Sequence, residues 1–145
     1  MSNLKLPTLS YAALDAALPA RSTEAASGAG RSHTIGYKTT AYRFNDEICI
    51  QHHDTTIATL SADTVSVTPH GYVSSTTTAR LHKVMVDNGL WPNAYTVGIR
   101  NRELMVLTPN TMRLGLLPVP WYGVTFVNTT HGWVLATRTT EKVSA

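Results

Sequence analysis

Hydroxyl side chains at residues 74–78 precede an apolar periodic segment that carries two cations, Arg80 and Lys83. Serine and threonine oxygens accept hydrogen bonds from the free backbone amides that begin a helix, and such a helix start attracts anions, phosphate included. Tyr72 lies just before this run and offers an aromatic ring. The pattern therefore predicts a nucleic-acid-binding surface, in which hydroxyls, amides and cations hold the phosphate backbone. Its predicted members are Tyr72, Thr76, Thr77, Thr78, Arg80 and Lys83.

A second group of aromatic and basic residues would extend this surface from the first predicted strand. It consists of Tyr37, Lys38, Tyr42 and Arg43. Interleaved aromatic and basic residues on a sheet suit a single nucleic-acid strand, because rings stack on bases and cations neutralise phosphates. The alternative for both groups is structural: the threonines only cap the helix, and the tyrosines pack.

Histidines offer another chemistry. His52 and His53, with His70, would form the centre of a metal-dependent hydrolase, since zinc needs three or four converging ligands. Adjacent residues on a strand point to opposite faces, so His52 and His53 do not both ligate easily unless the chain turns there. Cys49 lies between two isoleucines, which favours a buried, inert thiol. The sequence contains no Gly-x-Ser-x-Gly elbow and no phosphate loop. We therefore expect no enzyme, no metal site and no cofactor.

The candidate site residues are expected to lie on several short strands and one main helix. The spacing of apolar residues predicts a helix over residues 77–88, with Gly89 as its left-handed cap. Residues 109–122, rich in proline and glycine, are expected to form a structured loop. The fold class predicted is α+β and β-rich: a curved antiparallel sheet or small barrel of about eight short strands, with the helix packed on it. These strands are expected over residues 34–44, 47–52, 55–60, 63–68, 95–100, 103–108, 123–127 and 132–137.

The first part of the chain differs from the rest. Apolar residues between Leu9 and Leu18 predict a short helix, which Ser10 would cap and Pro19 would end. Alanine, serine, glycine and threonine then dominate residues 20–32, a composition typical of flexible linkers. We therefore expect residues 1–32 to be an N-terminal helix and linker, and residues 33–145 to be a single β-rich domain.

Composition limits the class of protein. The chain has 145 residues, of which 43% are hydrophobic and 14% charged, so wholesale disorder is not expected. The net charge of +3 permits contact with nucleic acid but does not require it. No apolar run is long enough for a transmembrane helix, and the N-terminus lacks the apolar stretch of a signal peptide. We expect a soluble protein without membrane contact.

One distinctive combination of residues spans positions 47–81. A strand ends in His52, Thr56 and Ile57 follow, and Gly71-Tyr72 then leads into a threonine cluster and Arg80. The pattern resembles small uncharacterised proteins of tailed bacteriophages, from which this chain departs at Ser74 and His82. The resemblance implies a phage origin and a place in the cytoplasm of the bacterial host. It implies no activity.

The leading hypothesis is a phage accessory protein that binds a macromolecule without catalysis, with nucleic acid as the first ligand. Lys38 and Arg43 join the helix-start residues in this predicted site. The alternative is a protein-binding module, either an inhibitor of a host enzyme or a virion component. Residues 114–122 and the N-terminal helix would then make the contacts, because exposed apolar patches mark interfaces. Exposed strand edges would also permit a homo-oligomer.

Overall fold

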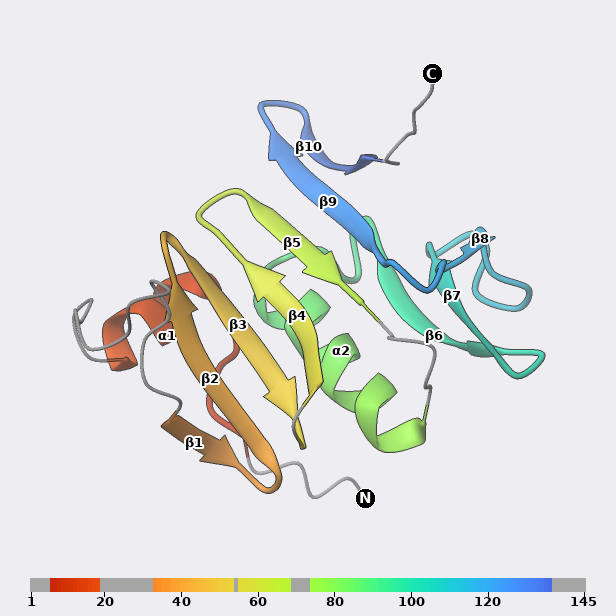
Figure 1. Ribbon diagram of the computed structural model, residues 1–145. Coiled ribbons are helices and arrows are strands. Elements are labelled where there is room, and N and C mark those ends of the chain that lie inside the picture. Colours follow the sequence, from red (N-terminus) through yellow and green to blue (C-terminus); the bar gives the residue numbers. More distant parts are fainter. Residues whose placement is uncertain (1–5, 19–32, 54, 69–73, 137–145) are drawn as a thin grey trace.

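The computed structural model (Figure 1) describes residues 6–18, 33–53, 55–68 and 74–136. These residues form two helices and ten strands. In chain order they are α1 (Tyr11–Ala17), β1 (His33–Gly36), β2 (Thr39–Phe44), β3 (Glu47–His52), β4 (Thr55–Leu60), β5 (Thr64–Val67), α2 (Ser75–Asp87), β6 (Thr96–Arg100), β7 (Glu103–Leu107), β8 (Leu117–Pro118), β9 (Val124–Thr129) and β10 (Gly132–Ala136).

The strands divide between two antiparallel sheets. A seven-stranded sheet has the order β1-β2-β3-β4-β5-β9-β10, and a three-stranded sheet has the order β6-β7-β8. The β-rich α+β class with an antiparallel sheet is therefore confirmed. The described strands do not close into the small barrel that was the alternative, because β1 and β10 end the larger sheet at opposite edges.

Tight turns set the register of the hairpins. Asn45 has a φ of 58° between β2 and β3, and Asn101 and Arg102 have φ values of 52° and 66° between β6 and β7. Positive φ at both central residues, as at Asn101 and Arg102, matches the right-handed twist of the flanking strands. The expected single strand over residues 34–44 is wrong. The chain instead turns at Lys38, where φ is 53°, and β1 folds back against β2.

The core lies on one face of the larger sheet. Alternate residues of its strands, among them Ile50, Val65 and Phe126, point toward both helices and are fully buried. Leu81 and Met85 of α2 cover them, as the predicted apolar stripe requires. Figure 1 shows α2 behind this sheet, between the sheet and β6. Burying each of these large side chains stabilises the fold by about 1.5–3 kcal/mol.

Helix α2 begins earlier than predicted, because the first hydroxyl of the run is its cap. Ser74 has extended φ and ψ, and its Oγ accepts from the Thr77 amide at 3.2 Å. At the other end, Asn88 is the C-cap residue and Gly89 has a φ of 85°. The predicted left-handed glycine cap is thus confirmed.

Helix α1 is part of the same core. Ser10 caps it by accepting from the Ala13 amide at 3.1 Å, as predicted. Leu14 is 1% exposed, and the Leu9 amide donates to Asp87 Oδ2 of α2 at 2.8 Å. The predicted linker, residues 20–32, and the predicted helix stop at Pro19 lie outside the described residues. No helix in the part of the chain described here is long and apolar enough to span a membrane.

Candidate functional site

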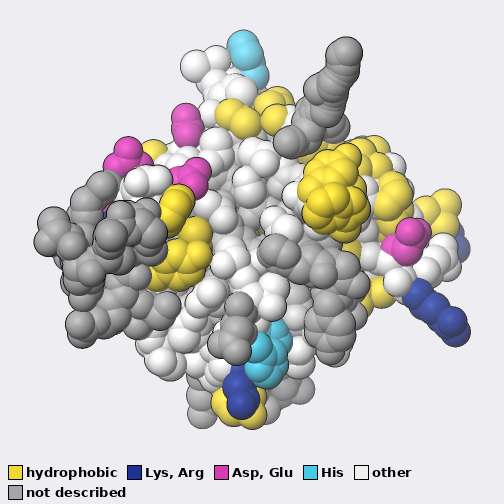
Figure 2. Space-filling view, in the orientation of Figure 1, with side chains coloured by type: hydrophobic (Ala, Val, Ile, Leu, Met, Phe, Trp, Pro, Cys, Tyr) yellow, Lys and Arg dark blue, Asp and Glu magenta, His cyan; other side chains and the backbone are white. Residues whose placement is uncertain are grey.

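Three segments that are distant in sequence meet at one end of the larger sheet. They are the turn at Tyr37 and Lys38, the end of β3 at His52 and His53, and the start of α2 over residues 74–80. We call this surface the polar end. It lies at the lower edge of the sheet in Figure 1, and in Figure 2 a cation, a histidine and an apolar side chain gather there. The predicted site residues Lys38, Thr76, Thr77, Thr78 and Arg80 all belong to it.

Arg80 lies beneath this surface and is only 4% exposed. Its Nε donates to Thr39 Oγ1 at 2.7 Å, its Nη1 to the Thr76 carbonyl at 3.0 Å, and its Nη2 to the Tyr37 carbonyl at 2.8 Å. No described carboxylate pairs with it. The expectation of a surface cation at Arg80 therefore needs correction: the guanidinium is an interior charge that ties the helix start to the β1–β2 turn.

Thr77 and His52 form the second buried contact of the polar end. His52 Nδ1 lies 3.0 Å from Thr77 Oγ1, and both residues are less than 7% exposed. Burial first, and then the positive charges of Arg80 and His53, lower the pKa of His52 to about 4. His52 is therefore neutral at neutral pH. Burial also lowers the pKa of Arg80, but a guanidinium begins so high that it keeps its charge.

The solvent-facing part of the polar end carries a ring, a cation and an imidazole. Tyr37 is 77% exposed, and Lys38 Nζ lies 5.7 Å from the centre of its ring. The His53 amide donates to the Lys38 carbonyl at 2.7 Å, which links the two turns. Thr76, in the first turn of α2, is also exposed. The chain thus turns at His53, where φ is 59°, as the predicted break after β3 requires.

Two predicted site residues lie elsewhere. Arg43 is on the core side of β2, and its guanidinium is 2.5 Å from Asp15 Oδ1 of α1. Lys83 Nζ pairs with Asp87 Oδ2 at 2.9 Å, one turn along α2. These cations therefore hold the N-terminal segment and α2 in place, and the polar end does not include them. Tyr72 and His70 lie outside the described residues, as does Asp54, which follows His53 in the sequence.

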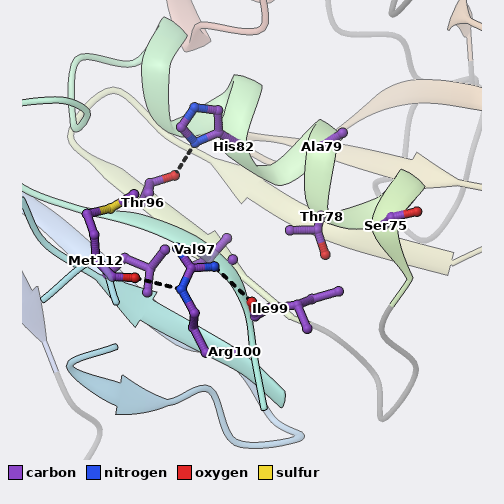
Figure 3. A pocket seen from close by; sticks show the side chains of 11 residues that line it. Ser75, Thr78, Ala79, His82, Thr96, Val97, Ile99, Arg100 and Met112 are labelled. Carbon is purple, nitrogen blue, oxygen red and sulfur yellow. Dashed lines mark hydrogen bonds between the residues drawn. The ribbon is translucent and has the colours of Figure 1, made fainter. Parts of the chain in front are cut away.

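A separate groove of about 400 Å³ lies between α2 and β6 (Figure 3). His82 Nδ1 lies 2.6 Å from Thr96 Oγ1 across it, and burial lowers the pKa of His82. Arg100 donates from Nε to the Met112 carbonyl at 2.6 Å and from Nη1 to the Ile99 carbonyl at 2.8 Å. Both side chains thus make hydrogen bonds within the fold, and the groove offers chiefly apolar surface. No sequence signal pointed to it.

Among the described residues, no group of three histidines, cysteines or carboxylates could hold a metal ion. The rings of His52 and His53 are 4.4 Å apart between centroids, but His52 Nδ1 is engaged by Thr77. The third residue of the proposed hydrolase, His70, is outside the described residues. The described part of the polar end therefore offers hydrogen-bonding and ionic contacts.

Comparison with known proteins assigns the family. The family model described as the Kyanoviridae Gp96 protein matches residues 22–140. The chain belongs to this phage family. The match confirms that it is a small phage protein, as the resemblance implied, and it spans every strand and α2 but not α1. The described polar end thus lies entirely within the Gp96 match. No curated protein and no solved structure matches the chain.

Proposed function

We propose that this phage protein binds nucleic acid at the polar end, without catalysis, in the cytoplasm of the bacterial host. One observation carries the proposal. An exposed tyrosine and lysine are held beside the first turn of α2 by a buried arginine that no described carboxylate pairs with. The positive charge of Arg80 is therefore not cancelled by a described partner, and its field favours an anion at the surface above it.

The start of α2 supplies the donors for a phosphate. The first amides of a helix have no intrahelical acceptor. Ser74 uses its Oγ for the Thr77 amide and its carbonyl for the Thr78 amide, so neither of these acceptors is used for the amides of Ser75 and Thr76. A phosphate there would also meet the positive end of the helix dipole. Lys38 would contribute a second ionic contact.

Tyr37 would supply the contact to a base. A ring that is 77% exposed gains little from the fold, whereas stacking on a base is worth about 1–3 kcal/mol. Stacking needs an unpaired base, so the arrangement favours single-stranded over duplex nucleic acid. Its described residues include no set of side chains that would read a particular sequence.

The test is fluorescence anisotropy of labelled single-stranded DNA and RNA, with a duplex of the same sequence as comparison. We expect single strands to bind more tightly and binding to weaken steeply with salt, because phosphate contacts release counterions. Lys38→Ala should reduce the slope of log K against log salt by about one. Arg102→Ala removes an exposed cation at the distant β6–β7 turn and should leave the slope unchanged. Absence of binding, or equal loss in both variants, would refute the proposal.

A further inference from the structure

Four large apolar side chains are exposed on the segment that leads into and out of β8. Leu114 is 75% exposed, Leu116 45%, Trp121 74% and Tyr122 55%. We call them the apolar patch. Figure 2 shows a broad apolar area on the side of the molecule that carries β7 and β8. Soluble monomers rarely leave such groups uncovered together, which marks the patch as an interaction surface.

Basic side chains outnumber acidic ones around the patch, where Glu103 at the β6–β7 turn is the exposed carboxylate among the described residues. Residues 104–136 contain no aspartate or glutamate, whereas Arg113 precedes the patch directly and is exposed. Arg102, at the turn between β6 and β7, is exposed as well. Arginine beside exposed aromatic rings is characteristic of the energetic centre of protein interfaces. The surface that covers the patch should therefore combine apolar side chains with carboxylates.

Such a surface exists on this chain, at the end of the larger sheet opposite the polar end. Asp46 and Glu47 lie at the β2–β3 turn, and Asp63 lies at the neighbouring β4–β5 turn; all are exposed. Phe44, beside them on β2, is 38% exposed. Several acidic side chains gather in this region in Figure 2, whereas a single one lies beside the apolar area. We call it the acidic end.

We infer that the apolar patch docks on the acidic end of a second copy of this chain. Arg113 of one copy would face the carboxylates of the next, while Trp121 and Leu114 would cover Phe44. If the apolar patches of two copies paired with each other instead, Arg113 of one copy would face Arg113 of the other. Repulsion between these like charges disfavours that arrangement. A head-to-tail contact of this kind is heterologous, and repeats to form a ring or an open chain of copies.

Sedimentation velocity of nuclease-treated, full-length protein tests the inference. We expect association at concentrations up to about 200 μM, which weakens as salt is raised. Trp121→Ser should weaken association at least about tenfold, because exposed aromatic anchors dominate such interfaces. Tyr37→Ser is the matched control: its ring is equally exposed but lies at the polar end, so association should be unchanged.

A charge reversal identifies the facing surface. Arg113→Glu should weaken association, Glu47→Arg should do the same, and the protein carrying both changes should associate as the original does. A monomer at every concentration, or unchanged association of Trp121→Ser, would overturn the inference. A Glu47→Arg protein that still associates fully would overturn the acidic end as the docking surface. Nucleic-acid binding is measured separately, so neither result decides the other.

Discussion

Arg80 Nη2 in the second turn of α2 donates to the main-chain carbonyl of Tyr37 in the β1–β2 turn at 2.8 Å, across 43 positions of sequence. Thr39 Oγ1 donates to the same carbonyl at 2.8 Å. The backbone that carries the exposed ring of Tyr37 and the ammonium of Lys38 is thereby fixed relative to the helix start. Preorganisation of this kind lowers the cost of ordering side chains when a ligand binds.

Arg80→Ala should lower the free energy of unfolding by about 2–4 kcal/mol, because it removes three hydrogen bonds to acceptors at the polar end and opens a cavity. The acceptors are Thr39 Oγ1 and the carbonyls of Thr76 and Tyr37. Urea unfolding measures the change. Arg102→Ala, at an exposed turn, should change stability by less than about 0.5 kcal/mol. An Arg80→Ala protein as stable as this control would show that the buried guanidinium does not hold the polar end together.

His52 should make the fold sensitive to mild acid. Its pKa is lowered from 6.5 to about 4 in the folded chain, so between these values the unfolded chain binds the extra proton. The stability that neutral His52 contributes is therefore fully present above about pH 6.5 and is lost as pH falls toward 4, by roughly 3 kcal/mol in all. Below pH 4 this loss stops growing.

His52→Gln isolates that titration. Unfolding free energies of the original and the variant, measured from pH 7 to pH 4, should converge as the pH falls, because glutamine does not titrate. If the free energies of unfolding of the two proteins instead fell in parallel between pH 7 and pH 4, His52 would not be the source of the acid sensitivity.

Gly123 allows β9 to begin close against the end of β5. Its φ is +91°, and a Cβ there would lie 2.3 Å from the Val67 carbonyl oxygen. Gly123→Ala should therefore destabilise the fold by about 3 kcal/mol or more, as strained and overpacked sites do. Gly132 also has a positive φ, +107°, but a Cβ there would meet nothing within 4 Å. Gly132→Ala should therefore lower the stability by only about 1 kcal/mol. Thermal unfolding of the two variants separates the steric clash expected at residue 123 from the backbone strain that both positions share. Equal losses would contradict the close approach.

Local alternation was enough to predict most of the strands. The eight predicted strands are present, with residues 34–44 divided into β1 and β2, and with β8 added inside the predicted loop. The division into two sheets was not predicted, because alternation does not encode which strands pair. The pairing of β5 with β9 joins Ser66 to Thr125, 59 positions apart. The turn at Lys38 was missed because neither Tyr37 nor Lys38 is a typical turn residue.

The candidate site was predicted in part. Hydroxyls at residues 74–78 do begin a helix, and Lys83 finds Asp87 at the spacing that helical pairs use. Arg80 was expected at the surface because charged residues are rarely buried. Its spacing from Thr77 and Val84 was nevertheless that of the buried stripe, and this signal was available. Nothing local to α2 indicates that the Tyr37 carbonyl lies within reach.

The most direct test of the central claim is an NMR titration of isotope-labelled protein with an unlabelled single-stranded oligonucleotide. Binding at the polar end predicts that the largest backbone amide shifts fall on Tyr37, Lys38, His53, Ser75 and Thr76. Amides of the distant turn at Asn101 and Arg102 should not move. Shifts centred on the apolar patch instead, or none at saturating oligonucleotide, would contradict nucleic-acid binding at the polar end.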